Sequence, residues 1–182
     1  FKSFGKRPEA FFGGYMKRFI MIGGTMGVGK TTTSQLLKKK LNHSVMLDGD
    51  WCWDMHPFIV NEETKAMVIN NIVYQLQSFI DCSVIENIIF CWVMHEQSII
   101  DQICDRLCLD DCQVYSISLV CDEQTLRQHL QKDIDLGLRE ESIIKRSLER
   151  MSCYDKLSTH QIDISSLKQD EIIQDIIEYI QK

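Results

Sequence analysis

The sequence predicts an α/β fold in which five parallel strands form one sheet with helices on both faces. From Lys17 onward, short apolar runs alternate with longer segments of helical period. The run NIIFCWV, residues 87–93, is apolar after its first residue, as expected of a strand covered on both faces. A glycine-rich stretch, GGTMGVGKTT at residues 23–32, follows the first strand directly. Strict alternation of strands and helices implies right-handed crossovers and therefore a parallel sheet.

The strands are predicted from short apolar runs that are rich in β-branched residues. They are expected at Arg18–Ile22, Ser44–Leu47, Asn87–Val93, Val114–Val120 and Gln161–Ile164. Ligands of such sheets bind at the carboxyl ends of the strands, so the residues that follow each strand are the candidates for a site.

The helices are predicted from apolar residues that recur with the 3.6-residue period. The first begins in the glycine loop, and Asn61 is the expected cap of the second, with Thr64 where a capping box prefers Glu or Gln. Further helices are expected at Glu96–Leu109, from Glu123, around residues 143–151 and around residues 172–180. The polar segment at about 131–142 is expected to be a lid.

Length and composition favour one domain, residues 16–182, with a leader or flexible arm at residues 1–15. The net charge of −6 argues against a nucleic-acid surface, which is usually basic. No apolar run approaches the ~20 residues of a membrane span, and residues 1–15 lack the apolar centre of a secretory signal. A cytoplasmic protein with a small ligand is expected, as monomer or homodimer.

Eight cysteines are present without a C-x-x-C pair. In a reducing compartment such cysteines are mostly buried thiols. Cys104, Cys108 and Cys112 repeat every four residues, which on a helix would align them on one face. A metal site there is disfavoured because zinc sites normally close with paired cysteines or histidines.

The glycine loop matches G-x-x-x-x-G-K-[ST] at every fixed position, between a predicted strand and a predicted helix. Its backbone N–H groups and the helix N-terminus favour polyphosphate, whereas an accidental glycine turn would need all these features to coincide. Lys30 would reach the outer phosphates, and the Thr31 hydroxyl would bind Mg²⁺. The expected nucleotide-binding residues of the loop are Gly24, Thr25, Met26, Gly27, Val28, Gly29, Lys30, Thr31 and Thr32.

Asp48 and Asp50 follow the second strand and would face this loop. One carboxylate can serve Mg²⁺ while the other accepts a proton from an acceptor hydroxyl, so we assign Asp48 to the metal and Asp50 to the acceptor. A solvated Asp-Gly turn is the plainer alternative. The guanine-binding string N-K-x-D is absent, and the third strand does not end in a carboxylate, which disfavours switch proteins and transport ATPases.

Glycine loop, D-x-D pair, basic lid and five parallel strands together resemble the small-molecule P-loop kinases, such as shikimate, adenylylsulfate and gluconate kinases and chloramphenicol phosphotransferase. The resemblance spans most of residues 17–182 and implies a three-layer P-loop kinase-like fold, ATP, Mg²⁺ and a small-molecule acceptor. It also implies lid arginines, with Arg139 first and Arg146 and Arg150 as alternates, although each could be a solvated surface charge. At the position of an adenine-stacking arginine stands His129, with Arg127 nearby.

The acceptor pocket is expected beside Asp50. Trp51 is the favoured wall, and His95 and Glu96 are further contacts; Trp53 and Phe58 fit the core equally well. Trp92 falls inside the third strand and is expected in the core. Shikimate is an improbable acceptor because the expected glycine-rich stretch after that strand is replaced by residues 93–96.

The leading hypothesis is therefore an ATP-dependent phosphotransferase with Lys30, Asp50, Arg139 and Arg146 as catalytic residues. A nucleotide-binding regulatory module that hydrolyses slowly, and a nucleoside monophosphate kinase, remain alternatives. The acceptor and the choice between ATP and GTP stay open.

Overall fold

The computed structural model describes residues 16–182, so the predicted leader at residues 1–15 lies outside the described part of the chain. The strands are β1 (Lys17–Gly23), β2 (Ser44–Asp48), β3 (Asn87–Cys91), β4 (Cys112–Val120) and β5 (His160–Asp163). The helices are α1 (Lys30–Lys40), α2 (Glu62–Asp81), α3 (Gln97–Cys104), α4 (Glu123–Asp135), α5 (Ser142–Met151) and α6 (Gln169–Ile180). Short 3₁₀ turns lie at Gly49–Trp53 and Tyr154–Lys156.

The five strands form one sheet in the order β2-β3-β1-β4-β5, and every pair is parallel. The predicted fold is confirmed. β1 occupies the centre, with β3 and β4 as its neighbours, while β2 and β5 lie at the edges. The loop after β1 therefore emerges between two strands that brace it from both sides.

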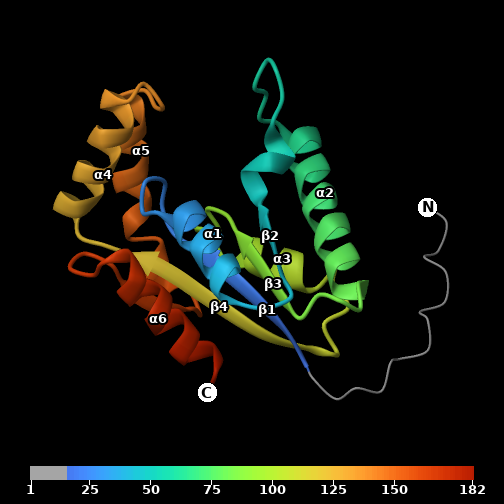
Figure 1. The fold of residues 1–182 in the computed structure, drawn as a ribbon. Coiled ribbons are helices and arrows are strands. Elements are labelled where there is room, and N and C mark those ends of the chain that lie inside the picture. The colour runs from blue at the N-terminus through green and yellow to red at the C-terminus, as the bar shows by residue number, and fades with distance from the viewer. Residues whose placement is uncertain (1–15) are drawn as a thin grey trace.

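Helices cover both faces of this sheet (Figure 1). Side chains of α2 and α3 pack with Phe19, Ile88 and Phe90 on one face. Side chains of α1 and α6 pack with Ile20 and Ile117 on the other. A third, smaller cluster joins α4 to α5, and it includes Met26 of the glycine loop. The pair α4 and α5 therefore rests against the loop.

The second helix begins with the predicted cap. The Asn61 side chain accepts from the Thr64 backbone N–H at 2.8 Å, and the Thr64 hydroxyl accepts from the Asn61 N–H at 3.0 Å. Thr64 thus does what Glu or Gln does in the usual capping box, and two orphan donors are satisfied reciprocally. The cap fixes the start of α2 directly after the exposed loop at residues 54–60.

Two predicted elements are shorter in the structure. The third strand ends at Cys91 instead of Val93, because its neighbour β2 ends in register with Cys91 and Met94 adopts a left-handed φ of 26°. The third helix ends at Cys104 instead of Leu109. Cys104, Cys108 and Cys112 consequently end a helix, lie in a loop and begin a strand, so they share no helix face. In the described part of the chain, no group of three or more His, Cys, Asp or Glu side chains is placed to hold a metal ion.

The predicted lid segment is half helical. Helix α4 continues to Asp135, and only residues 136–141 lie outside helices. Gly137 adopts φ +70° after the helix. Its N–H donates to the Ile134 carbonyl oxygen, and the Leu138 N–H donates to the Asp133 carbonyl oxygen. These are the two hydrogen bonds of a Schellman cap, which needs glycine at this position. The turn between α4 and α5 is therefore short and well defined.

Candidate functional site

The glycine loop curls between β1 and α1 with three glycines at positive φ: Gly24 at 144°, Gly27 at 88° and Gly29 at 97°. A Cβ on Gly24 would lie 2.7 Å from the Leu119 carbonyl oxygen, and one on Gly27 would lie 2.5 Å from Leu130 Cδ2. Both conformation and space therefore require glycine. Gly29 is the left-handed cap from which α1 starts, so the first free N–H groups of the helix face the loop.

Lys30 is the first residue of α1, and its side chain folds back over the loop. Its ammonium group donates to the Thr25 carbonyl oxygen at 3.0 Å. Burial lowers the Lys30 pKa from 10.5 to about 8; weaker effects come from Cys91, Asp50 and Asp48, which favour the charge, and from Arg139, which opposes it. An anionic partner would strongly stabilise the charged form of such a buried amine.

Thr31 and Asp48 are joined directly. The Thr31 hydroxyl donates to Asp48 Oδ2 at 2.7 Å, and Asp48 Oδ1 accepts from the Asp50 backbone N–H at 3.1 Å. Asp48 is only 6% exposed. A hydroxyl and a carboxylate are hard oxygen donors that suit Mg²⁺, which takes few protein ligands and keeps waters and phosphate oxygens for the rest. The donor set therefore fits a magnesium ion.

Asp50 is exposed, and its Oδ1 accepts a hydrogen bond from Trp92 Nε1 at 3.0 Å. The expectation that Trp92 lies inside the third strand is wrong, because β3 ends at Cys91; the ring is half-buried and packs against the edge of the core. Its ring covers Gly49: a Cβ there would lie 2.5 Å from Trp92 Cγ. The sequence held a signal for this contact, since Trp92 and Asp50 both follow strands that are neighbours in the sheet.

The predicted acceptor residues gather near Asp50 with unequal exposure. Trp51 is 55% exposed, and Phe58, left open between core and surface, is 67% exposed. Trp53 is half-buried, with its ring 6.4 Å from Trp92 and 5.9 Å from Phe58. We call Trp51, Trp53, Phe58 and Trp92 the aromatic wall: Trp53 contacts Phe58 and Trp92, and Trp51 is the exposed ring two residues before Trp53.

His95 lies half-buried after β3, and its Nε2 is 3.5 Å from Glu96 Oε1. Burial lowers the pKa of His95, with a further lowering by the charge of Arg150 and an opposing effect of Glu96. Its other nitrogen, Nδ1, is buried without a hydrogen-bond partner among the described residues. His95 is therefore mostly neutral at physiological pH.

The lid helices touch the glycine loop at three points. The Thr25 hydroxyl donates to the Ser147 carbonyl oxygen at 2.8 Å, and an Arg150 nitrogen lies 3.9 Å from Met26 Sδ. His129 Nδ1 lies 3.2 Å from the Gly27 carbonyl oxygen. The loop is thus gripped by α4 and α5, although sequence reasoning missed the Thr25 contact because a backbone acceptor leaves no mark in the sequence.

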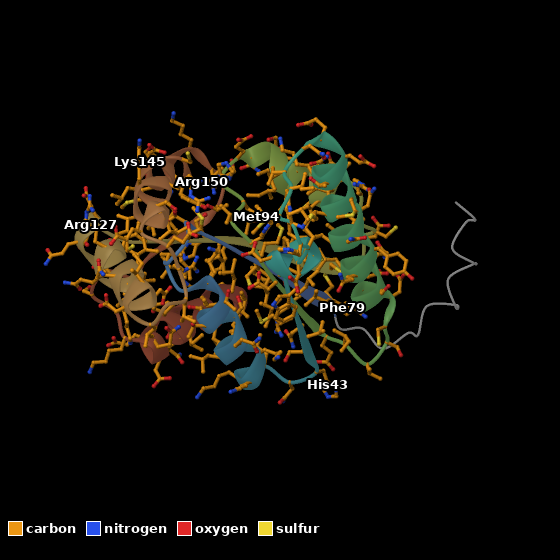
Figure 2. The ribbon with its side chains drawn as sticks, turned by 90° about the horizontal axis from the view of Figure 1, so that it is seen from above. His43, Phe79, Met94, Arg127, Lys145 and Arg150 are labelled. Carbon is orange, nitrogen blue, oxygen red and sulfur yellow. The ribbon has the colours of Figure 1, made fainter. Side chains whose placement is uncertain are left out.

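The lid arginines differ in placement. Arg139 makes an ion pair with Asp133 at 2.9 Å, within the lid. Arg146 is exposed on α5. Seen from above, Arg150 lies further toward the centre of the molecule than Arg127 and Lys145, which lie at the outer rim (Figure 2). Arg150, an alternate in the sequence analysis, is therefore the arginine held closest to the loop by a direct contact.

Residues 20–162 match the model of a family described as AAA domain. Three solved structures are similar over nearly the whole chain. The tunicamycin resistance protein of Deinococcus radiodurans has 18% identity and a TM-score of 0.68, covering 90% of this chain and 95% of its own. A gluconokinase from Sinorhizobium meliloti 1021 has 13% identity and a TM-score of 0.64, covering 92% and 99%.

The third is a shikimate kinase from Acinetobacter baumannii, in complex with shikimate, with 16% identity and a TM-score of 0.61, covering 92% and 94%. The resemblance to the small-molecule P-loop kinases is thereby confirmed for the fold. No curated protein matches the chain in sequence. No helix in residues 16–182 combines the length and the apolar character needed to cross a bilayer.

Proposed function

The chain belongs to the AAA domain family, and from that premise we propose that it is a kinase that transfers the γ-phosphate of ATP to a hydroxyl of a small molecule. One observation carries the proposal: Lys30, Thr31 and Asp48 meet at a glycine loop that only glycines can form. A loop, an ammonium and a hydroxyl–carboxylate pair in this arrangement are what a nucleoside triphosphate requires.

The residues of the loop bind the polyphosphate. Backbone N–H groups between Gly24 and Thr31 surround the phosphates, and the Lys30 ammonium exchanges the Thr25 carbonyl for phosphate oxygens. Thr31 and Asp48 would hold a magnesium ion, which neutralises charge on the phosphates when bound. Binding regains the charge interaction that burial denies Lys30 in the free protein.

Asp50 acts on the acceptor. The acceptor hydroxyl oxygen attacks the γ-phosphorus, the bond from that phosphorus to the bridging oxygen breaks, and ADP leaves. The hydroxyl proton passes to Asp50. Trp92 occupies Oδ1 of this carboxylate, which orients the group and leaves Oδ2 for the proton. Both oxygens of the Asp48 carboxylate accept hydrogen bonds, from the Thr31 hydroxyl and from the Asp50 N–H. Asp48 is therefore assigned to the metal, and Asp50 to the proton of the acceptor.

The lid completes the site. The guanidinium groups of Arg139, Arg146 and Arg150 can stabilise the negative charge of the transferring phosphoryl group, and Arg150 already contacts Met26. The hydrogen bond from Thr25 to Ser147 ties α5 to the loop, so that lid and phosphates stay in register. Exclusion of water by the lid suppresses simple hydrolysis. His129, against Gly27, is the side chain of α4 best situated for the nucleotide base.

The experiment has two stages. Equilibrium dialysis against Mg·ATP and Mg·GTP, with and without EDTA, compares the parent with Lys30→Ala and Thr31→Val. We expect Lys30→Ala to lose binding and Thr31→Val to lose the part that depends on Mg²⁺. ADP release is then measured with a panel of hydroxyl compounds. Nucleotide binding without any stimulating acceptor would favour a regulatory module, and absence of binding by the parent would end the proposal.

A further inference from the structure

The half of the site that faces the acceptor is almost free of fixed positive charge. Between Leu41 and Asp105 the only lysine or arginine is Lys65. Its ammonium pairs with Glu62 at 2.9 Å on the surface of α2. This stretch includes β2, the 3₁₀ turn that holds Asp50, α2, β3 and α3. A phosphate or carboxylate on an acceptor would find no partner among them.

Carboxylates in this half add to the same effect. Asp48, Asp50, Asp54 and Glu96 are all close to strand ends or to the loop that follows β2. An anionic group beside them would be repelled, and repulsion between like charges grows as water is excluded. The charge pattern therefore selects against anions and leaves uncharged or basic acceptors.

The aromatic wall selects further. Three tryptophans and a phenylalanine lie beside Asp50, and the rings of Trp51 and Phe58 are largely exposed. Ile59 and Val60 continue the exposed apolar surface up to the start of α2. Flat apolar surfaces of this kind bind ring systems and the apolar faces of sugars.

Two nitrogen atoms in the same region are unsatisfied. Trp53 Nε1 and His95 Nδ1 are buried without a hydrogen-bond partner among residues 16–182. Buried polar groups are normally paired, and leaving one unpaired costs about 1–3 kcal/mol. Neither nitrogen supplies a fixed positive charge, since indole is neutral and burial and Arg150 keep the pKa of His95 low; a ligand reaches either atom only if the side chains shift on binding.

Among residues 16–182, Arg150 is the one cation with an electrostatic effect on His95. It lies on α5 rather than on the acceptor half, and its guanidinium is held 3.9 Å from Met26 Sδ in the phosphate loop. That contact places the Arg150 guanidinium beside the phosphate loop, where its anionic partner is the transferred phosphate. Arg106 follows the end of α3 and donates to Asn70 of α2 at 2.7 Å, away from the strand ends where the site lies.

Resting on the proposed kinase function, we propose that the phosphate acceptor is a hydroxyl compound with an apolar ring face that carries neither phosphate nor carboxylate. The only fixed cation between Leu41 and Asp105, Lys65, is paired with Glu62, so this half of the site disfavours an anionic group on the acceptor. The aromatic wall supplies stacking surfaces in its place.

Tryptophan fluorescence tests this directly, because the only three tryptophans of the chain all belong to the aromatic wall. The protein is loaded with Mg²⁺ and a non-hydrolysable ATP analogue and titrated with matched pairs: uridine and uridine monophosphate, glucitol and gluconate, shikimate methyl ester and shikimate. Inorganic phosphate is titrated as a bare anion. We expect saturable fluorescence changes with neutral members, at least about tenfold tighter than with their anionic counterparts, and none with phosphate.

Trp51→Ala should weaken binding of the neutral members, while Val84→Ala, at an exposed apolar residue beyond α2, should not. Equal or tighter binding of the anionic members would overturn the acceptor class, and so would a lack of response to every compound. Failure of the kinase function itself is recorded separately, as failure of the ATP analogue to bind before any acceptor is added.

Discussion

Nucleotide binding should be accompanied by uptake of a proton by Lys30. In the free protein burial lowers the Lys30 pKa to about 8, so that at about pH 8 roughly half of the molecules carry a neutral lysine. Bound polyphosphate surrounds the amine with negative charge and restores a pKa near the ordinary value of 10.5. Because the pKa rises on binding, protons are taken up and not released.

The magnitude follows from that pKa. Uptake should be about 0.1 proton at about pH 7, about 0.5 at about pH 8 and about 0.9 at about pH 9. The affinity for ATP should fall about tenfold for each pH unit above about 8, until the pKa of the complex is reached. The terminal phosphate of ATP is ionised throughout this upper range and adds little.

Isothermal titration calorimetry in pairs of buffers with different ionisation enthalpies measures the uptake. Lys30→Met should abolish it, together with most of the affinity. Lys145→Met makes the same change at a lysine that is 84% exposed, and should leave both unchanged. If the parent binds ATP with no more proton uptake at about pH 8 than at about pH 6.5, the account of Lys30 as a buried ammonium is refuted.

Three further outcomes are expected. Asp50→Asn should lower turnover about 10²- to 10⁴-fold with little change in ATP affinity, measured by steady-state kinetics and dialysis; a near-normal rate would demote Asp50 to a turn residue. Gly49→Ala should lower the free energy of unfolding by about 1–3 kcal/mol in urea, because its Cβ would meet Trp92 at 2.5 Å. Gly23→Ala, whose Cβ has no contact under 3.6 Å, is the control, and equal losses would contradict the packing argument. Asn61→Ala should lower the free energy of unfolding by about 1 kcal/mol through loss of the α2 cap. An unchanged urea midpoint would show that the cap does not contribute to stability.

The parallel sheet could be predicted because apolar runs and helical periods alternate without interruption. The glycine loop was equally readable, since its fixed positions report a backbone shape that only glycine permits. The meeting of Thr31 and Asp48 follows from the fold alone: Thr31 lies in the first turn of the helix after the central strand, and Asp48 ends the strand two places away in the sheet. These features depend on local sequence and on topology.

Other features depend on contacts between distant segments. The apolar run places Trp92 inside the third strand, yet β3 ends at Cys91, in register with the end of β2, and Trp92 lies at the border of the core. The Thr25 hydroxyl donates to the backbone carbonyl oxygen of Ser147, and because every residue has this acceptor, the contact could not be predicted from residue type. Periodicity also could not tell that a Schellman cap at Gly137 would shorten the lid turn.

The position of β2 at the border of the sheet has a consequence for how such a catalyst can change. The phosphate cradle emerges from β1, which is hydrogen-bonded on both sides, whereas Asp50 and Trp51 emerge from a strand with a single neighbour. Substitutions in the residues that follow β2 therefore disturb few of the contacts that hold the glycine loop. A change of acceptor specificity can evolve at the edge of the sheet without loss of the central phosphate-binding loop.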